Sequence, residues 1–254
     1  MQKKLCWIIG ASHGIGESLA KKYFESGFDL AISARSEDKL KSIRNEILSA
    51  NQNSSGQILV SKTDVSEAAS IQSSADEIIA KFGRIDLVIF CSAIYQPTKA
   101  IGFDLDESLK TINVNLNGAF NLLHVILPQF TKQNSGHIAF VASVAGYRGL
   151  PQSFAYGASK AALINLCEGI YPELKRLNID VSVINPGFVK TRLTDKNSFS
   201  MPFIITPQKA AEIIYQGLEA KKFEIHFPKI FTTFLKILRI LPNFIFLKIV
   251  SKIK

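Results

Sequence analysis

LCWIIGASHGIG, residues 5–16, is the stretch that decides the fold. It opens with five apolar residues, which predict a buried strand, and Gly10, Gly14 and Gly16 follow as a tight turn. Residues 17–27 then have the spacing of an amphipathic helix and end at a glycine. Glycines in such a turn let the backbone approach a pyrophosphate, and the helix N-terminus favours an anion. The stretch predicts a nucleotide-binding turn; the alternative is a plain turn.

The rest of the chain repeats this alternation of apolar and amphipathic stretches. Strand-like runs lie at residues 5–10, 28–35, 57–64, 84–93, 136–143 and 178–187, with a candidate seventh at 223–228. Helical spacing is found at residues 17–27, 36–50, 66–83, 104–130 and 153–177, with Ser36 and Ser66 as expected N-caps. Strict alternation predicts a parallel sheet with helices on both faces. Right-handed crossovers then give an α/β, Rossmann-like doubly wound fold of about seven strands.

Composition and length indicate one globular domain, over residues 1–228, in a reducing compartment. The chain has 254 residues, of which 47% are hydrophobic and 20% charged, as in globular proteins. Three widely spaced cysteines without a CxxC motif and four scattered histidines support neither a disulfide framework nor a metal site. The first lysines precede a short apolar run without a cleavage-like region, so we expect a cytoplasmic protein.

Most of the net charge belongs to the last residues of the chain. The formal net charge is +9, and six of these charges come from residues 229–254, which contain no Asp or Glu. The other 228 residues are only mildly basic and show no basic face interleaved with aromatic residues. This distribution argues against nucleic acid as a partner.

The end of the second strand-like run distinguishes two nucleotides. An acidic residue there would bind the ribose 2′-hydroxyl of NAD, but the chain has Arg35 followed by Ser36. A guanidinium can bind a 2′-phosphate through two hydrogen bonds, so we expect NADP(H) in preference to NAD(H). The alternative is a solvated surface arginine. In the glycine turn, His13 would add a partial charge, and Ser12 and Ile15 are further expected cofactor contacts.

Asp64 and Val65 close the third strand-like run and are also expected beside the cofactor. Asp64 is a candidate acceptor for the adenine amino group. It is equally a candidate helix cap, and the sequence favours neither role.

YGASK, residues 156–160, is the candidate reaction centre. Tyr156 and Lys160 are four residues apart and share one helical face. A nearby ammonium favours the phenolate and lowers the pKa of a phenol, which then suits proton transfer. The alternative is a packed ring beside an exposed charge. Ser143, at the end of the fifth strand-like run, would hydrogen-bond a substrate oxygen, and Asn115 would hold a water or a backbone group near the lysine.

Together these residues resemble a classical short-chain dehydrogenase/reductase of the NADP-preferring type, over about residues 5–227. The resemblance rests on the glycine turn, on Asn115 in NVNLNG, and on Ser143 placed thirteen residues before YGASK. NPGFVKT, residues 185–191, resembles the family's PGxVxT segment, and SARSED resembles the NADP-preferring members.

The resemblance implies a role for each of these residues. Tyr156 would be the proton donor or acceptor, and Lys160 would lower its pKa and bind the nicotinamide ribose. Ser143 would orient the substrate carbonyl, and Asn115 would support a proton-relay water. The nicotinamide carboxamide would be held by Pro186, Val189 and Thr191.

Two departures from the family pattern affect the cofactor side. The family usually has Thr before the first glycine, where this chain has Ile9. It usually has NNAG after the fourth strand, where this chain has FCSA, residues 90–93. The two polar groups normally tie these segments together. Losing both at once can be nearly neutral, because neither partner is left unpaired.

Two further segments would surround the substrate. Residues 188–207, here called the lid, are polar and broken by two prolines, and they follow the sixth strand-like run, where ligands of such sheets bind. Residues 229–254 are here called the tail. Its residues 229–241 read as a basic amphipathic helix with a wide apolar face, ended by Pro242, and residues 243–254 continue in the same style. That face fits a membrane surface, a subunit interface or a flap over an apolar cleft.

The sequence therefore predicts an NADP-dependent oxidoreductase that acts on a ketone or secondary alcohol, with a lipophilic substrate. It would be a homodimer or homotetramer, either free in the cytoplasm or peripheral on the inner face of a membrane. The alternatives are a nucleotide-binding regulator without turnover and a membrane-associated scaffold. The presence of Asn115, Ser143, Tyr156 and Lys160 together favours the enzyme.

Overall fold

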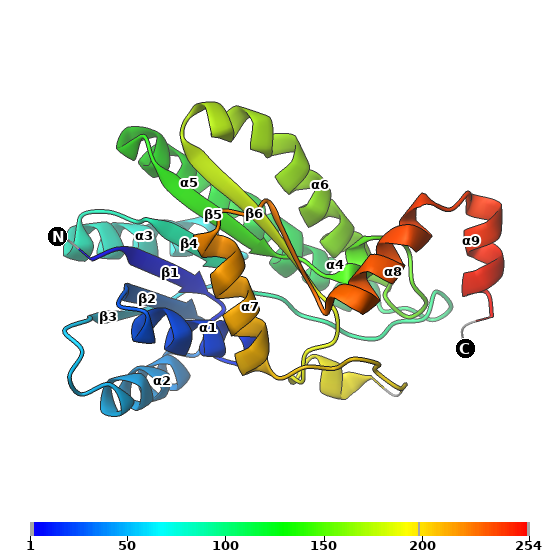
Figure 1. The fold of residues 1–254 in the computed structure, drawn as a ribbon, viewed down its shortest axis with the longest axis horizontal. Coiled ribbons are helices and arrows are strands. Elements are labelled where there is room, and N and C mark those ends of the chain that lie inside the picture. The colour runs from blue at the N-terminus through cyan, green and yellow to red at the C-terminus, as the bar shows by residue number, and fades with distance from the viewer. Residues whose placement is uncertain (1–2, 198, 253–254) are drawn as a thin grey trace.

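A parallel seven-stranded sheet forms the centre of the structure, a computed structural model that describes residues 3–197 and 199–252 (Figure 1). The strands are β1 (Leu5–Ile9), β2 (Asp29–Ala34), β3 (Ile58–Lys62), β4 (Leu87–Phe90), β5 (Gly136–Val141), β6 (Ile179–Pro186) and β7 (Glu224–Phe227). Their order is β3-β2-β1-β4-β5-β6-β7, and every neighbouring pair is parallel. The order reverses between β1 and β4, so the crevice for a ligand opens at their carboxyl ends.

Helices cover both faces of this sheet, and the predicted α/β fold is confirmed (Figure 1). They are α1 (Gly14–Glu25), α2 (Glu37–Ala50), α3 (Ala68–Phe82), α4 (Leu105–Ile112), α5 (Gly118–Gln133), α6 (Phe154–Arg176) and α7 (Pro207–Glu219). Alternate residues of β1 point to opposite faces. Trp7 and Ile9 pack in the core formed with α3, α5 and α6. Cys6 and Ile8 pack in the core formed with α1, α2 and α7.

The helix predicted over residues 104–130 is interrupted in the structure. A π-helical turn, Asn113–Asn117, separates α4 from α5, and Asn115 lies inside it. Such a turn adds one residue to a helical repeat and so changes the direction of the side chains that follow, and it is frequent at functional sites. The prediction of one regular helix is wrong at this point, because the apolar spacing on either side carries no sign of the extra residue.

The two predicted serine caps also differ from the prediction. Ser36 does occupy the N-cap position of α2, but its side chain makes no capping hydrogen bond. The N-cap of α3 is Glu67, and Ser66 instead donates to Asp64 through both its backbone N–H and its hydroxyl. The turn before α3 is therefore closed by the aspartate.

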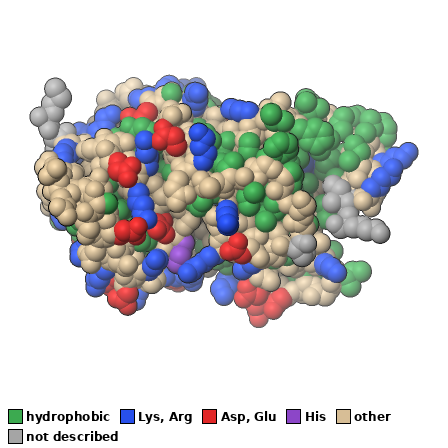
Figure 2. Space-filling view, turned by 60° about the horizontal axis from the view of Figure 1, so that its bottom comes forward, with side chains coloured by type: hydrophobic (Ala, Val, Ile, Leu, Met, Phe, Trp, Pro, Cys, Tyr) green, Lys and Arg blue, Asp and Glu red, His purple; other side chains and the backbone are tan. Residues whose placement is uncertain are grey.

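The tail forms two helices, α8 (Lys229–Ile240) and α9 (Asn243–Val250), that extend from one end of the molecule (Figure 1). The polar stripe of α8 faces the protein: Thr232 is fully buried against His226, and Lys236 pairs with Glu224. The apolar stripe faces outward, with Ile230 75% and Ile240 81% exposed. Figure 2 shows hydrophobic side chains gathered at this end of the molecule. The most exposed apolar side chains of α8 therefore point away from the protein.

One arginine fastens the tail to the loop between β5 and α6. The Arg148 guanidinium donates to the carbonyls of Leu238, Arg239 and Leu241 at the end of α8, and to the Asn243 side chain. It also stacks 4.0 Å from the ring centroid of Phe246, the buried residue of α9. Within residues 3–197 and 199–252, no helix combines the length and hydropathy needed to cross a membrane. Residues 253–254 of the tail and residue 198 of the lid lie outside the described chain.

Candidate active site

A cavity at the carboxyl ends of β1, β4, β5 and β6 brings together most of the predicted site residues. Those that line it are His13, Gly14, Ile15, Gly16, Ser143, Tyr156, Lys160, Pro186, Val189 and Thr191. Cys91 and Ala93, from the FCSA departure expected beside the cofactor, also line it. The cavity is further lined by residues for which the sequence predicted no contact: Val141, Ala142, Gly187, Arg192, Leu193 and Thr194. The glycine turn and the YGASK segment, about 140 residues apart in the chain, therefore share one cavity.

The glycine turn has the close backbone approach that a dinucleotide needs. Gly10 has a φ of +92°, and a Cβ there would lie 2.6 Å from the backbone nitrogen of Ser92. A Cβ on Gly16 would collide with the Gly10 carbonyl oxygen. A side chain at either position would fill the turn or displace it. Since α1 begins at Gly14, its N-terminal N–H groups face the same turn. The chain therefore fits a bound pyrophosphate here.

Two cations, Arg192 and Lys39, act on His13 in the glycine turn. His13 occupies the N-cap of α1, and its Nδ1 lies 3.1 Å from the Ser12 hydroxyl. Burial is the main cause that lowers the pKa of His13, and the charges of Arg192 and Lys39 lower it further. Arg192 belongs to the lid, and sequence analysis did not identify it. The only signal for it was a cation directly after the PGFVKT segment.

The remaining predicted nucleotide residues lie outside the cavity lining. Arg35 and Ser36 are exposed at the end of β2. Asp64 accepts from the backbone N–H and hydroxyl of Ser66, at 3.0 and 2.6 Å, and this contact is the main cause that lowers its pKa. Asp64 thus closes the turn before α3, and it is not the cap of that helix, because the N-cap is Glu67. Val65 is buried, and its side chain fills the space beside Gly118.

On α6, Lys160 is buried and Tyr156 is half-buried, and the two side chains lie side by side. The Lys160 Nζ is 5.5 Å from the centroid of the Tyr156 ring and donates to the Val141 carbonyl at 2.7 Å. Ser143 caps a short helical turn, and its Oγ accepts from the Ala145 N–H at 3.1 Å. This bond uses an acceptor site of the hydroxyl and leaves its proton to donate.

The expected lowering of the Tyr156 pKa is not found, and this prediction is wrong for the structure. Burial raises the pKa of Tyr156 to about 12, although interaction with the Ser143 hydroxyl acts in the opposite direction. Burial also lowers the pKa of Lys160 to about 8. Desolvation disfavours the charged form of both groups, and the lysine nitrogen points at a backbone carbonyl. The sequence argument counted the neighbouring charge and not the loss of water.

Asn115 does not line the cavity but supports one of its walls. Its Oδ1 accepts from the Ile94 N–H at 2.8 Å, and its Nδ2 donates to the Ile94 carbonyl at 3.0 Å and to the Ser159 hydroxyl at 3.1 Å. Both amide protons are therefore used inside the protein. Asn115 ties the segment after β4 to α6, and only its oxygen retains a free acceptor site.

The two departures from the family pattern are compensated by packing. Ile9 and Phe90 are fully buried in the same core. The Cys91 N–H donates to the Ile9 carbonyl at 2.7 Å, so a backbone bond joins the two segments. Apolar contact and this bond hold β1 beside the segment after β4.

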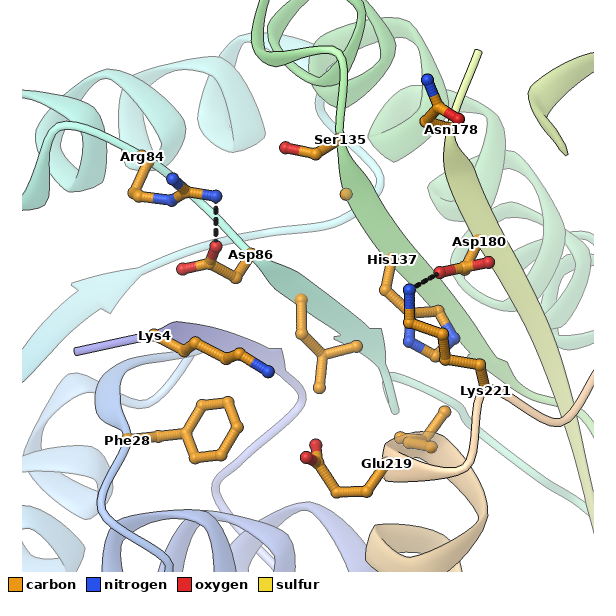
Figure 3. Close-up of a pocket in the computed structure, with 13 residues that line it drawn as sticks. Lys4, Phe28, Arg84, Asp86, Ser135, His137, Asn178, Asp180, Glu219 and Lys221 are labelled. Carbon is orange, nitrogen blue, oxygen red and sulfur yellow. Dashed lines mark ion pairs between the residues drawn. The ribbon is translucent and has the colours of Figure 1, made fainter. Parts of the chain in front are cut away.

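A second cavity lies at the opposite, amino-terminal edge of the sheet (Figure 3). Ion pairs of Arg84 with Asp86 and of Lys221 with Asp180 occupy its rim. None of the described residues that line it belongs to the predicted site. The cavity at the carboxyl edge is therefore the candidate active site.

Comparison with known proteins identifies the family. Residues 4–200 match the family model for the short chain dehydrogenases. An uncharacterized oxidoreductase of Myxococcus xanthus is 30% identical over 97% of this chain and 96% of its own length. The fold is that of a short chain dehydrogenase/reductase from Burkholderia phymatum in complex with NAD, with a TM-score of 0.84, 22% identity and 92% of each chain covered.

A second structure widens the range of related folds. A variant of the actinorhodin polyketide ketoreductase with NADPH has a TM-score of 0.79 and 20% identity, covering 88% of this chain and 94% of the other. The resemblance noted in the sequence is thus confirmed by a family match over most of the chain. The protein is a dehydrogenase/reductase enzyme and belongs to the short chain dehydrogenase family.

Proposed function

We propose that this enzyme transfers a hydride between NADP(H) and a ketone or secondary alcohol, with Tyr156 as the acid-base residue. The observation that carries the proposal is the single cavity shared by the glycine turn, Ser143, Tyr156 and Lys160. A nucleotide-binding regulator would need the glycine turn alone. The placement of the phenol and the serine hydroxyl in the same cavity favours the enzyme over the regulator.

Different residues of the chain would bind different parts of the cofactor. The turn from Gly10 to Gly16 would hold the pyrophosphate, and Lys160 the nicotinamide ribose. Thr191 closes on the turn, since its Cγ2 lies 2.9 Å from where a Cβ on Gly14 would be. With Pro186 and Val189 it would hold the carboxamide. When bound, the nicotinamide supplies or accepts the hydride.

Side chains of the protein would transfer the proton and polarise the substrate carbonyl. The Ser143 hydroxyl donates to the substrate oxygen, because its contact with the Ala145 N–H leaves its proton free. The Tyr156 hydroxyl transfers its proton to the same oxygen in reduction and takes it back in oxidation. The Lys160 ammonium stabilises the phenolate left after reduction. Asn115 keeps the segment after β4 in place and offers one oxygen to a relay water.

The preference for NADP(H) rests on charge at the end of β2. Arg35 is exposed there, and the charges of Arg192 and Lys39 act on the nearby His13. These cations suit a 2′-phosphate, and no carboxylate takes the place of Arg35 in the sequence.

Replacing Arg35 by alanine should therefore weaken the binding of NADPH and leave that of NADH unchanged. We expect the KM for NADPH to rise about 10- to 100-fold with the KM for NADH unchanged, because a charge-assisted hydrogen bond contributes about 1.5–3 kcal/mol. The measurement is oxidation of each nucleotide with a panel of hydrophobic ketones. Arg176→Ala, at the far end of α6, is the matched control. Equal KM values for NADPH in wild type and Arg35→Ala would refute the preference. Absence of oxidation with every ketone would refute the proposed reaction.

A lipophilic substrate fits the aromatic wall behind the cavity. Phe231 of α8 stacks on Phe188 of the lid at 5.6 Å, and Phe199 and Phe203 join the same cluster. Phe231 also packs against Gly187, which lines the cavity. The lid and the start of the tail thus place aromatic rings behind Gly187, at the wall of the cavity.

The outward face of the tail suits an anionic membrane surface. Ile230, Phe234 and Ile240 are exposed, and the tail adds cations without any acidic residue. Apolar side chains flanked by Lys and Arg are the composition of helices that lie in the interface of anionic bilayers. Such a position would bring lipophilic carbonyl compounds to the cleft. A subunit contact through the same face is the competing explanation.

Phe234→Ser should weaken binding to vesicles. We expect wild type to pellet with phosphatidylglycerol vesicles, and the variant to need about tenfold more lipid, because one buried Phe contributes about 1.5–3 kcal/mol. Phe120→Ser is the matched control, since Phe120 is 51% exposed and Phe234 57%. If wild type does not pellet and instead forms a dimer that Phe234→Ser converts to monomer, the face is a subunit interface and the membrane proposal is wrong.

A further inference from the structure

We infer that Tyr95 is a positioning residue that latches the lid over the reaction centre. Tyr95 follows β4 in the chain and was not identified from the sequence. It contacts Tyr156 with its ring and the lid with its hydroxyl. We call the contacts of Tyr95 and Gln96 with Lys196 and Asn197 the latch. Its effect on kinetics rests on the proposed function, whereas its effect on the motion of the lid does not.

On the catalytic side, the Tyr95 ring meets the Tyr156 ring edge-on. The ring centroids are 4.9 Å apart with an interplanar angle of 62°. Edge-to-face pairs of this kind stabilise a defined ring orientation. The backbone before Tyr95 is restrained, because Asn115 hydrogen-bonds both the N–H and the carbonyl of the preceding residue, Ile94. Asn115 therefore fixes the base of the latch.

On the lid side, three hydrogen bonds cross from the segment after β4. The Tyr95 hydroxyl donates to the Asn197 Oδ1 at 2.9 Å. The Lys196 Nζ donates to the Tyr95 carbonyl at 2.8 Å and to the Gln96 Oε1 at 3.2 Å. The lid is thereby joined at its middle to a segment about 100 residues earlier in the chain.

The two ends of the lid are held differently from its middle. The Lys190 N–H donates to the Ile205 carbonyl at 2.9 Å, and the Ile205 N–H to the Phe188 carbonyl at 3.1 Å, so a backbone bridge closes the base. The middle depends on side-chain bonds from Lys196 and Asn197. Side-chain bonds at a partly exposed site break more readily than a backbone ladder. The lid can therefore open at the latch while its base stays closed.

A closed latch has a consequence for the substrate. The phenol of Tyr156 lines the cavity and interacts there with Ser143 and with the ring of Tyr95, beside Lys160. A substrate must enter past the latch and is then enclosed by it. If a variant lowers the population of the closed lid, the apparent affinity for substrate falls in the same proportion.

The first test measures the latch without any substrate. Tyr95→Phe removes one hydrogen bond and keeps the ring, and Asn197→Ala removes its acceptor. In both variants we expect amide hydrogen exchange of residues 190–197 to become about 3- to 10-fold faster, as loss of one net hydrogen bond predicts. Tyr171→Phe, which removes a hydroxyl from α6 at a ring packed on Phe223, should leave it unchanged. Unchanged exchange in Tyr95→Phe would overturn the latch.

The second test measures kinetics, with NADPH and 2-decanone as the probe. Tyr95→Phe and Asn197→Ala should each raise the KM for the ketone about 3- to 10-fold with kcat within about twofold of wild type. The double variant should be no worse than either single one, because both remove the same bond. Additive effects, or a fall in kcat without a change in KM, would contradict a latch. If wild type reduces no ketone, the proposed function fails, and hydrogen exchange still decides the latch.

Discussion

Tyr156→Phe should lower kcat for ketone reduction by about 10²- to 10⁴-fold, the usual contribution of a positioned acid-base group. The substitution removes the phenolic proton, which lies in the cavity beside the Ser143 hydroxyl. Loss of the hydroxyl leaves the half-buried ring and its contact with Tyr95 in place. The KM for NADPH should therefore stay within about twofold of the wild-type value. Steady-state kinetics with NADPH and 2-decanone provide the measurement.

The pH dependence of the wild type follows from the raised pKa of Tyr156. Because burial raises this pKa to about 12, the phenol stays protonated over the neutral and moderately alkaline range. Reduction needs the protonated phenol and the Lys160 ammonium, so its kcat should be independent of pH from about 6 to 8 and should fall above pH 8, where Lys160 loses its proton. Oxidation of an alcohol needs the phenolate, so its kcat should rise about tenfold for each pH unit in that range. If bound cofactor lowers the pKa of Tyr156, the kcat for reduction begins to fall at a lower pH.

Tyr171→Phe is the control for the loss of a phenol elsewhere on α6 and should keep wild-type kcat. Retention of more than about a tenth of wild-type kcat by Tyr156→Phe would exclude the phenol as the main proton donor. A parallel loss of NADPH binding would mean that the variant has lost the site and not only the proton. Fluorescence titration with NADPH separates the two outcomes.

The fold and the centre of the site could be predicted because they depend on local patterns. Apolar runs that alternate with amphipathic stretches leave few topologies other than a doubly wound sheet. The glycine turn after the first strand and the four-residue spacing of Tyr156 and Lys160 are also local. The carboxyl ends of parallel strands meet at one edge, so Ser143 could be placed beside them. The family match confirms the resemblance drawn from these residues.

What the sequence did not show depends on tertiary contact. Tyr95 reaches Asn197 across 102 positions of the chain, and no spacing rule joins YQPTK to the lid. Arg192 matters only because the lid folds back toward His13. The polar stripe of α8 turned inward because Glu224 and His226 of β7 offer partners to Lys236 and Thr232. Helical periodicity identifies two faces but not which one finds a partner.

The same limit applies to the buried lysine, for which we expect opposite effects on stability and activity. Lys160→Met should lower kcat by at least about 10²-fold, since the phenolate loses its cation. At pH 7 it should nevertheless raise the free energy of unfolding by about 1–2 kcal/mol. Folding lowers the pKa of Lys160 from 10.5 to about 8, and each pH unit of this difference corresponds to about 1.4 kcal/mol. The orphaned Val141 carbonyl offsets part of the gain.

The sign of the effect fixes the pH range in which it can be measured. Below about pH 8 the lysine is charged in both states, and the folded protein carries the full cost of a buried ammonium. As the pH rises from about 8 to 10.5 the folded lysine loses its proton first, so wild type gains stability and the advantage of the variant disappears.

Thermal unfolding at pH 7 and pH 10 measures both limits, with an expected difference of about 2–6 °C in Tm at pH 7 only. Lys132→Met, at an exposed position of α5, should change Tm at neither pH. A lower Tm for Lys160→Met at pH 7 would show that Lys160 stabilises the fold, through its bond to Val141, by more than its desolvation costs. The Lys160 ammonium would then stabilise the fold as well as serve catalysis. The active site would not lower the stability of the protein, as a buried charge otherwise does.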